Sequence, residues 1–336
     1  MITIKEIAKI AGVSATTVSR VINGRGKVGD KCRKKVQKLI DDLGYRPNIN
    51  ARALAGQKAD FLGIVTPNFS SPFYGNLASG ISDAAIDAKH RVMMSNSNKT
   101  NTVFDAVESL RDFGCDNIVL HNKDLSDDEI IKLAEENQGL VLINRFISEI
   151  ANRCVWLDNC SAGRAAAEFL YKNGHRKIAI INSDRNISDP FDRLFGIKQY
   201  FSAKGIEIIN DNIKYAVPSL QGGIDSARAL AEEGADFTAV IAYNDTMAVG
   251  AMNEFQNLGF KVPEQISVMG FDDILIASTS RPFLTTMRYP IYDMGQYAAK
   301  LSIQLTKTEA SSINQSHQFM STLVERQSVK KMIESS

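Results

Sequence analysis

Short apolar segments alternate with longer amphipathic segments from residue 61 onward, and this alternation constrains the fold more than any other feature. The apolar segments predict strands at 61–66, 92–95, 117–121, 139–143, 177–182, 239–243 and 266–270. Helical patterns lie between them, for example at 75–89, 161–173, 190–204 and 245–258. Such alternation is typical of parallel sheets covered by helices on both faces. The number of units is too large for one open sheet, so we expect two doubly wound subdomains.

Length and composition favour a globular, cytosolic protein. The chain has 336 residues, of which 44% are hydrophobic, which is enough for two or three domains. No apolar run approaches the roughly 18 residues that span a membrane. Lys5 and Glu6 interrupt the segment where a signal peptide would be apolar. The cysteines show no CxxC pair and no zinc-site spacing, so we expect free thiols and no metal or cofactor; they are Cys32, Cys115, Cys154 and Cys160.

The net charge of +1 conceals a strong asymmetry between the N-terminal segment and the rest of the chain. Residues 1–58 contain 13 Lys or Arg and 4 Asp or Glu, a balance of +9, whereas the remaining 26 basic and 34 acidic residues leave −8. A solvated basic face without a partner is one interpretation. A concentrated positive charge joined to an acidic body favours nucleic acid as the partner of the N-terminal segment.

The first 46 residues predict a helix-turn-helix domain. Apolar residues at i, i+3, i+4 and i+7 mark one face of a short helix; they are Ile4, Ile7, Ala8 and Ala11. Gly12 suits a left-handed C-terminal cap, and Ser14 suits the N-cap of a second helix that runs to about Asn23. A third helix is expected at about 31–43. Two short helices joined by a glycine-containing turn are typical of the helix-turn-helix motif.

The second helix of this motif enters the major groove of DNA, so its outward side chains are the predicted contacts. Arg20 is the strongest candidate for a base edge, because its guanidinium can reach guanine O6 and N7 together. A three-helix protein-interaction module is the alternative. The predicted DNA-contacting residues of this domain are Thr3, Ser14, Ala15, Thr16, Thr17, Ser19, Arg20 and Asn23.

Polar and aromatic side chains follow several of the predicted strands. Ligands in doubly wound folds bind beyond the carboxyl ends of the strands, so these residues should converge. Amide, carboxylate and guanidinium groups pair with sugar hydroxyls, and an aromatic ring stacks on the apolar face of a pyranose. The sequence therefore predicts a sugar site, with the candidate residues Phe73, Tyr74, Asn144, Asp189, Arg193, Asn244 and Asp272, flanked by Arg145, Asp245, Phe271 and Asp273.

Each candidate also has a structural interpretation. Asp189 and Asp245 are suited to helix N-caps and Asn244 to a turn. Phe73 and Tyr74 are suited to a core, and Arg193 to an ion pair.

Catalysis is not indicated. The sequence contains no GxSxG, HExxH, P-loop or GxGxxG motif. Asp272 and Asp273 are neighbours, whose side chains tend to point apart, whereas a glycosidase needs two facing carboxylates. The four histidines form no constellation, although His121 ends a strand and is placed to approach a ligand.

The segment "TIKEIAKIAGVSATTVSRVING" resembles the N-terminal signature of the LacI/GalR family of bacterial transcription regulators. Further along, "NISDPFDRLFG", "FTAVIAYNDTMAVGAM" and "GFDDILIASTSRPFLTTMRYPI" are similar to the galactose repressor and isorepressor branch. Gly29 and Cys32 depart from the family pattern before the third helix, and Pro218 stands where relatives often have an aromatic residue.

This resemblance implies a core like a periplasmic sugar-binding protein, with crossovers near 157–160, 284–290 and 317–321. It places the seven candidates named above at effector-contact positions, and it implies a homodimer that binds a pseudopalindromic operator and is released by D-galactose. The implied domains are 1–46, a hinge helix at 47–58, and a core at 59–336. The core divides into an N-subdomain at about 59–158 and 288–318 and a C-subdomain at about 159–287 and 319–336.

Other readings remain open. The effector is alternatively another sugar, a purine or a partner protein, and a sugar-binding protein without a regulatory role is the candidate from a different class.

The linker "YRPNINARALAG", residues 45–56, favours a helix rather than a flexible tether. Asn48 can start this helix and Gly56 can stop it, but two turns are only marginally stable in isolation. In the family the matching segment is a hinge helix that folds on operator DNA and inserts a leucine between base steps, which bends the duplex. The resemblance assigns DNA contacts to Asn48, Ala51 and Leu54.

We therefore expect Leu54→Ser to weaken operator binding while leaving sugar affinity intact, because the serine side chain is too small and polar to act as a wedge. Gel shifts with operator DNA and calorimetry with the sugar measure the two affinities. Equal operator affinity for the variant and the parent protein would rule out the wedge.

Overall fold

The computed structural model describes residues 2–22, 26–45, 60–98, 100–122, 124–307 and 317–332. The chain divides into an N-terminal unit, residues 1–60, and a core unit, residues 61–336, which are described separately. Four of the predicted DNA contacts lie outside the described residues, namely Asn23, Asn48, Ala51 and Leu54, as does the predicted hinge helix at 47–58.

The N-terminal unit contains the three predicted helices, α1 (Ile4–Ala11), α2 (Ala15–Ile22) and α3 (Asp30–Asp42). Thr3 and Glu6 form a capping box at the start of α1, and Gly12 ends it in the left-handed conformation with φ 68°. The Ser14 hydroxyl accepts a hydrogen bond from the Thr17 amide at 3.1 Å, as an N-cap of α2 does. The helices enclose a small core that includes Ile7, Val18 and Val36. The predicted helix-turn-helix is confirmed.

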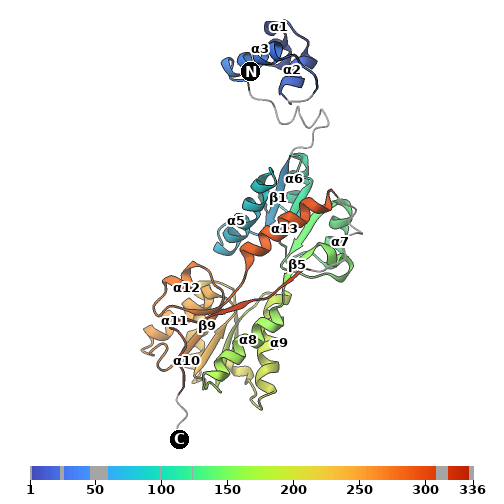
Figure 1. Ribbon diagram of the computed structural model, residues 1–336. Coiled ribbons are helices and arrows are strands. Elements are labelled where there is room, and N and C mark those ends of the chain that lie inside the picture. The colour runs from blue at the N-terminus through green and yellow to red at the C-terminus, as the bar shows by residue number, and fades with distance from the viewer. Residues whose placement is uncertain are drawn as a thin grey trace. The chain divides into compact units, whose positions relative to one another are not determined.

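The first sheet of the core unit has the strand order β11-β5-β4-β3-β1-β2, and all of its pairs are parallel. Its strands are β1 (Phe61–Thr66), β2 (Arg91–Asn96), β3 (Asn117–Leu120), β4 (Gly139–Ile143), β5 (Cys154–Leu157) and β11 (His317–Phe319). Helices α5 (Pro72–Asp87) and α13 (Ile291–Leu305) cover one face and lie side by side in Figure 1. Helices α6 (Val103–Asp112) and α7 (Asp127–Glu136) cover the other face, and a 3-10 helix, η1 (Ser148–Arg153), precedes β5.

The second sheet has the order β12-β10-β9-β8-β6-β7 and is parallel except for the β10–β12 pair. Its strands are β6 (Ile178–Ser183), β7 (Ile213–Ala216), β8 (Ala239–Ala242), β9 (Ser267–Asp272), β10 (Thr285–Arg288) and β12 (Thr322–Val324). Helices α8 (Asn159–Lys172) and α9 (Ser188–Ser202) cover one face, and α10 (Leu220–Glu232) and α11 (Asp245–Asn257) cover the other. The short helices η2 (Asn210–Asn212) and α12 (Leu275–Thr279) lie in connections.

The two sheets confirm the predicted pair of doubly wound subdomains, which are called here the first-sheet and second-sheet subdomains. The chain passes between them after β5, after β10, and between β11 and β12. Five strands were not predicted, namely β5, β7, β10, β11 and β12. Each has only three or four residues, and most carry polar or exposed side chains that dilute the apolar pattern.

Glycines allow close packing where α8 and α9 cross. A Cβ at Gly163 would lie 2.1 Å from the Arg193 carbonyl oxygen, and a Cβ at Gly196 would lie 2.0 Å from the Cys160 carbonyl oxygen. These contacts are possible only without side chains. The two glycines therefore allow the short distance between α8 and α9, and this distance determines where Arg193 on α9 lies.

We expect Gly196→Ala to lower the free energy of unfolding by about 1–3 kcal/mol, because the added methyl group meets backbone atoms that cannot move aside. Urea denaturation of the full chain measures this change. Gly75→Ala is the matched control, because Gly75 lies in α5 with no heavy atom within 4 Å of the added Cβ. It should be neutral or stabilising, and an equal loss in both variants would contradict the packing argument.

Candidate functional site

A cavity of about 160 Å³ lies between the two subdomains, at the carboxyl ends of their strands. All seven residues predicted from the sequence line it, namely Phe73, Tyr74, Asn144, Asp189, Arg193, Asn244 and Asp272. The lining also includes Asn68, Ser71, Arg185, Ile187, Pro218, Tyr243 and Tyr289, none of which was named as a candidate contact. The volume lies below the roughly 300–1,000 Å³ of pockets for drug-sized ligands, so the cavity suits a small molecule.

Arg193 is the buried cation of the cavity, with 4% of its surface exposed. Its Nε donates to Asn159 Oδ1 at 2.8 Å, and its Nη1 donates to the Tyr243 carbonyl oxygen at 2.7 Å. The guanidinium carbon lies 4.6 Å from the centre of the Phe271 ring and 4.9 Å from that of Tyr243. These contacts hold the guanidinium plane in one orientation.

The remaining nitrogen of Arg193 faces the carboxylates of the cavity. Nη2 lies 3.9 Å from Asp272 Oδ1, too far for a direct hydrogen bond. Burial alone would lower the pKa of Arg193, but Tyr243 and the negative charges of Asp272 and Asp189 raise it overall. Arg193 therefore stays charged, and the alternative interpretation, an ion pair, describes only part of its environment.

Asn144 links the two subdomains through its side chain. Its Nδ2 donates to Asp189 Oδ2 at 3.1 Å, across the boundary between β4 and α9. Asn144 Nδ2 also lies 3.3 Å from His121 Nε2, which accepts in this pair because an amide nitrogen can only donate. The Tyr289 hydroxyl donates to Asn144 Oδ1. Burial and the nearby Asp189 raise the pKa of Tyr289 well above its ordinary value, which keeps this donor protonated.

An aromatic cluster forms the wall of the cavity on the first-sheet side. The centre of the Phe73 ring lies 5.5 Å from that of Tyr74 and 5.2 Å from that of Tyr289, both in edge-to-face geometry. His121 joins the cluster at 5.0 Å from Tyr74. Phe73 and Tyr74 pack against the core, as their structural interpretation expects, and they also line the cavity.

The adjacent carboxylates at the end of β9, Asp272 and Asp273, make different contacts. Asp272 faces Arg193, whereas Asp273 accepts hydrogen bonds from Arg288 Nε at 2.7 Å and Arg326 Nη2 at 2.5 Å. Both residues have positive φ, 104° and 57°, which is uncommon outside glycine and marks a constrained turn. Asp273 thereby ties this turn to the ends of β10 and β12, next to two of the three crossovers.

Asp245 stabilises the same turn through hydrogen bonds. It is fully buried, and its carboxyl accepts hydrogen bonds from the Ile274 amide at 2.9 Å and the Thr286 hydroxyl at 2.5 Å. Burial, reinforced by the charge of Asp272, raises its pKa well above the ordinary value. The N-cap of α11 is instead Asn244, whose Oδ1 accepts from the Met247 amide at 2.9 Å. The suggestions of an N-cap for Asp245 and for Asp189 are wrong, because α9 has Ile187 at its N-cap.

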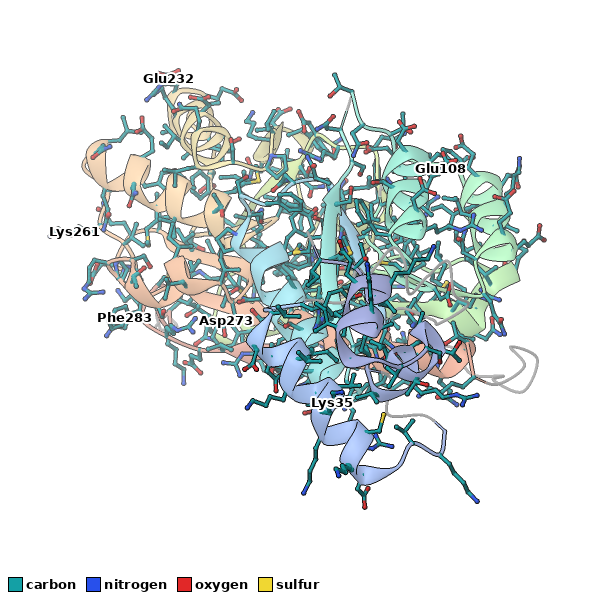
Figure 2. All side chains as sticks on the ribbon, turned by 90° about the horizontal axis from the view of Figure 1, so that it is seen from above. Lys35, Glu108, Glu232, Lys261, Asp273 and Phe283 are labelled. Atoms are coloured by element: carbon teal, nitrogen blue, oxygen red, sulfur yellow. The ribbon has the colours of Figure 1, made fainter. Side chains whose placement is uncertain are left out.

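The predicted DNA contacts that the structure describes lie along α2 and at the start of α1. Ala15, Thr16 and Arg20 are exposed, whereas Thr17 and Ser19 are half-buried. Thr3 and Ser14 are exposed but also act as helix caps. On α3, Lys35 is exposed and extends from the ribbon in Figure 2.

Metal binding has no structural support within the described ranges, where no group of three His, Cys, Asp or Glu side chains is arranged to hold an ion. Within the same residues, no helix has the length and apolarity needed to cross a bilayer.

Similarity to known proteins extends over nearly the whole chain. Residues 3–48 match the bacterial regulatory proteins of the lacI family, and residues 167–329 match the periplasmic binding protein-like domain. The transcriptional regulator GalS of Salmonella typhimurium is 39% identical over 98% of this chain and 97% of its own length. The chain belongs to the lacI family of bacterial regulatory proteins. GalR of Escherichia coli, another member, is 37% identical over 98% of this chain and 96% of its own length.

Solved structures of lacI-family proteins share the architecture. The lac repressor dimer bound to operator and the anti-inducer ONPF superposes with a TM-score of 0.87 at 25% identity, covering 98% of this chain and 99% of that one. The regulator CelR in complex with cellobiose gives a TM-score of 0.70 at 26% identity, over 98% of this chain and all of that one. The family consists of DNA-binding regulators, so the chain is a DNA-binding transcriptional regulator and not an enzyme.

We expect Tyr289→Phe to lower the free energy of unfolding by about 1–2 kcal/mol, because the buried carbonyl oxygen of Asn144 loses its donor. Urea denaturation measures the loss. Tyr292→Phe is the control, since the exposed Tyr292 hydroxyl donates to Asp83 at the surface and water can replace it. A loss of the same size in the control would show that the Asn144 contact has no special weight.

Proposed function

We propose that the chain represses genes for sugar uptake and metabolism, and that D-galactose or a closely related hexose binds the cavity and releases the repressor from its operator. The proposal places the protein in the cytosol and assigns Phe73, Tyr74, Asn144, Asp189, Arg193, Asn244 and Asp272 as effector contacts. It assigns the exposed side chains of α2 and the linker residues Asn48, Ala51 and Leu54 to DNA.

The observation that carries the sugar assignment is the composition of one small cavity. Two carboxylates, a fixed guanidinium and three amides line the same 160 Å³ as an aromatic wall. Planar polar groups bind pairs of adjacent hydroxyls, and the aromatic rings suit the apolar face of a pyranose. Galactose in particular is supported by the names and identity of the relatives GalS and GalR, at 39% and 37%.

Dimeric binding follows from the reach of a single helix-turn-helix. One recognition helix contacts only a few base pairs, and two related by a twofold axis read a pseudopalindrome at useful affinity. The lac repressor, whose structure is similar, is a dimer on its operator. We assign the same assembly to this chain.

The coupling between sugar and DNA would act through the boundary between the subdomains. The Asn144–Asp189 hydrogen bond crosses this boundary inside the cavity, and the Asp273 ion pairs hold the turn after β9 to two crossover strands. A sugar that contacts both subdomains changes their preferred arrangement to the extent that it binds the two arrangements differently. That difference would then alter the spacing of the two DNA-binding heads.

Calorimetric titration with galactose, fucose and glucose, run beside operator gel shifts, tests the proposal. Galactose should bind and lower operator affinity, with a coupling of about 5- to 150-fold. If galactose binds without changing operator affinity, induction is wrong. If another of the sugars binds and releases the operator instead, the effector assignment is wrong and the regulatory role stands.

We expect Arg193→Ala to abolish the response to sugar and to preserve operator binding, because the substitution removes the one buried cation that faces the cavity carboxylates in the described residues. Gel shifts with and without galactose measure both properties. Arg164→Ala is the control, since Arg164 lies exposed on the neighbouring helix α8 and does not line the cavity. Induction retained by Arg193→Ala would remove Arg193 from the site.

A further inference from the structure

The outer face of α3 carries a row of lysines at positions i, i+3, i+4 and i+7, which places them on one side of the helix. The four, called here the lysine stripe, are Lys31, Lys34, Lys35 and Lys38. All of them are exposed, and Lys35 is labelled in Figure 2. Val36 and Ile40, on the opposite side of α3, are buried in the small core of the N-terminal unit. The stripe therefore points away from that core.

The lysine stripe is unfavourable for α3 by itself. Each of its lysines has two others three or four residues away, and like charges at these spacings repel one another. Lys31 lies in the first turn, where the helix dipole disfavours a positive charge and only Asp30 offsets it. Gly29 at the N-cap provides no side-chain hydrogen bond. A bound polyanion would remove the repulsion within the stripe.

No carboxylate neutralises the lysine stripe. Within the ranges that the structure describes, none of its ammonium groups forms an ion pair. Exposed lysines of the core unit behave differently: Lys172 pairs with Glu168 at 2.7 Å, and Lys177 pairs with Asp236 at 2.5 Å. The stripe is thus a concentrated positive charge that is available to an anionic partner.

The chemistry of the stripe favours duplex nucleic acid as this partner. Lysine is depleted in the buried centres of protein interfaces, and single-stranded nucleic acid is bound through stacking on aromatic rings. Helix α3 contains no aromatic residue. The stripe extends over roughly 10 Å of helix, and a duplex carries one phosphate charge for about every 1.7 Å of its axis. Four flexible ammonium groups can therefore each reach a phosphate.

The stripe and the recognition helix α2 face different sides of the N-terminal unit. Each of the three helices packs against the other two, with Val18 of α2 and Val36 of α3 in the shared core. The outer faces of three mutually packed helices point in three directions. A duplex seated on the exposed side of α2, which includes Arg20, therefore leaves the outer face of α3 to another duplex.

We propose that the lysine stripe of α3 binds the phosphate backbone of a second DNA duplex while α2 holds the operator. Each DNA-binding head then contacts two duplexes, the operator by base sequence and the second by charge alone. The second contact is independent of sequence and weakens as the salt concentration rises. It goes beyond the proposed function and requires no particular effector.

Capture of a second duplex by operator-bound protein tests the inference. The full chain is bound to immobilised operator DNA, unlabelled operator in solution fills any free α2, and a labelled duplex of unrelated sequence is added. The labelled duplex should be retained. Its affinity should fall on the order of 100-fold between about 50 and 200 mM salt, as expected for about four phosphate contacts. An unaltered chain that retains no labelled duplex at low salt would overturn the inference.

A variant without the stripe locates the contact. Lys31→Gln, Lys34→Gln, Lys35→Gln and Lys38→Gln, made together, should lower retention at least about tenfold and change operator affinity less than about threefold. Glutamine has nearly the helix propensity of lysine, so α3 should persist, which urea denaturation checks. Arginine at the same four positions keeps the charge and should keep the retention.

A charge-matched control separates the stripe from net charge. It carries glutamine at four exposed lysines of the core unit, namely Lys132, Lys261, Lys300 and Lys307. This control should retain the labelled duplex as the unaltered chain does. Equal losses in the control and the stripe variant would contradict the assignment to α3.

Two further outcomes would also overturn the inference. If the slope of log operator affinity against log salt changes by about 0.9 for each stripe lysine removed, the stripe contacts the operator itself. If operator-bound protein retains a labelled acidic polypeptide but no duplex, the stripe is a protein-docking surface. Neither outcome affects the sugar assignment, because release by galactose is measured on the unaltered chain with operator alone.

Discussion

The buried guanidinium of Arg193 is the constraint around which the cavity is arranged. A charge with 4% exposure is stable only if its surroundings replace the water that it loses. Asn159, the Tyr243 carbonyl oxygen and two aromatic rings supply most of that replacement, and Asp272 balances the charge. These partners lie on α8, after β8 and on β9, whereas Arg193 itself lies on α9. The position of the Arg193 side chain therefore depends on how four separate elements pack.

The packing in turn depends on residues that never contact the cavity. Gly163 and Gly196 let α8 and α9 approach until backbone meets backbone, and this contact brings Asn159 at the start of α8 to the guanidinium on α9. On the other side, Asp245 holds the turn that carries Asp272. The charges that face the cavity are therefore positioned by backbone packing and by hydrogen bonds that lie outside the cavity.

Much of this arrangement could be predicted from the sequence. Long amphipathic helices and apolar strands have clear periodicity, and the rule that sites lie after parallel strands led to Asn144, Asn244 and Asp272, which line one cavity. Tyr289 was missed as a lining residue because it follows β10, a four-residue strand with two threonines that has no apolar pattern. Asn159 was missed because its contact with Arg193 depends on how two helices cross, which local sequence does not encode.

The way the chain divides between the two sheets has a consequence for biosynthesis. The first sheet is made mainly of residues 61–157, but one of its faces is covered by α13, and its edge strand β11 begins at residue 317. A ribosome will thus have produced nearly the entire second-sheet subdomain before the first-made sheet can bury its apolar face. Nascent chains stalled before residue 291 should carry an exposed hydrophobic surface, which is the kind of intermediate that chaperones recognise.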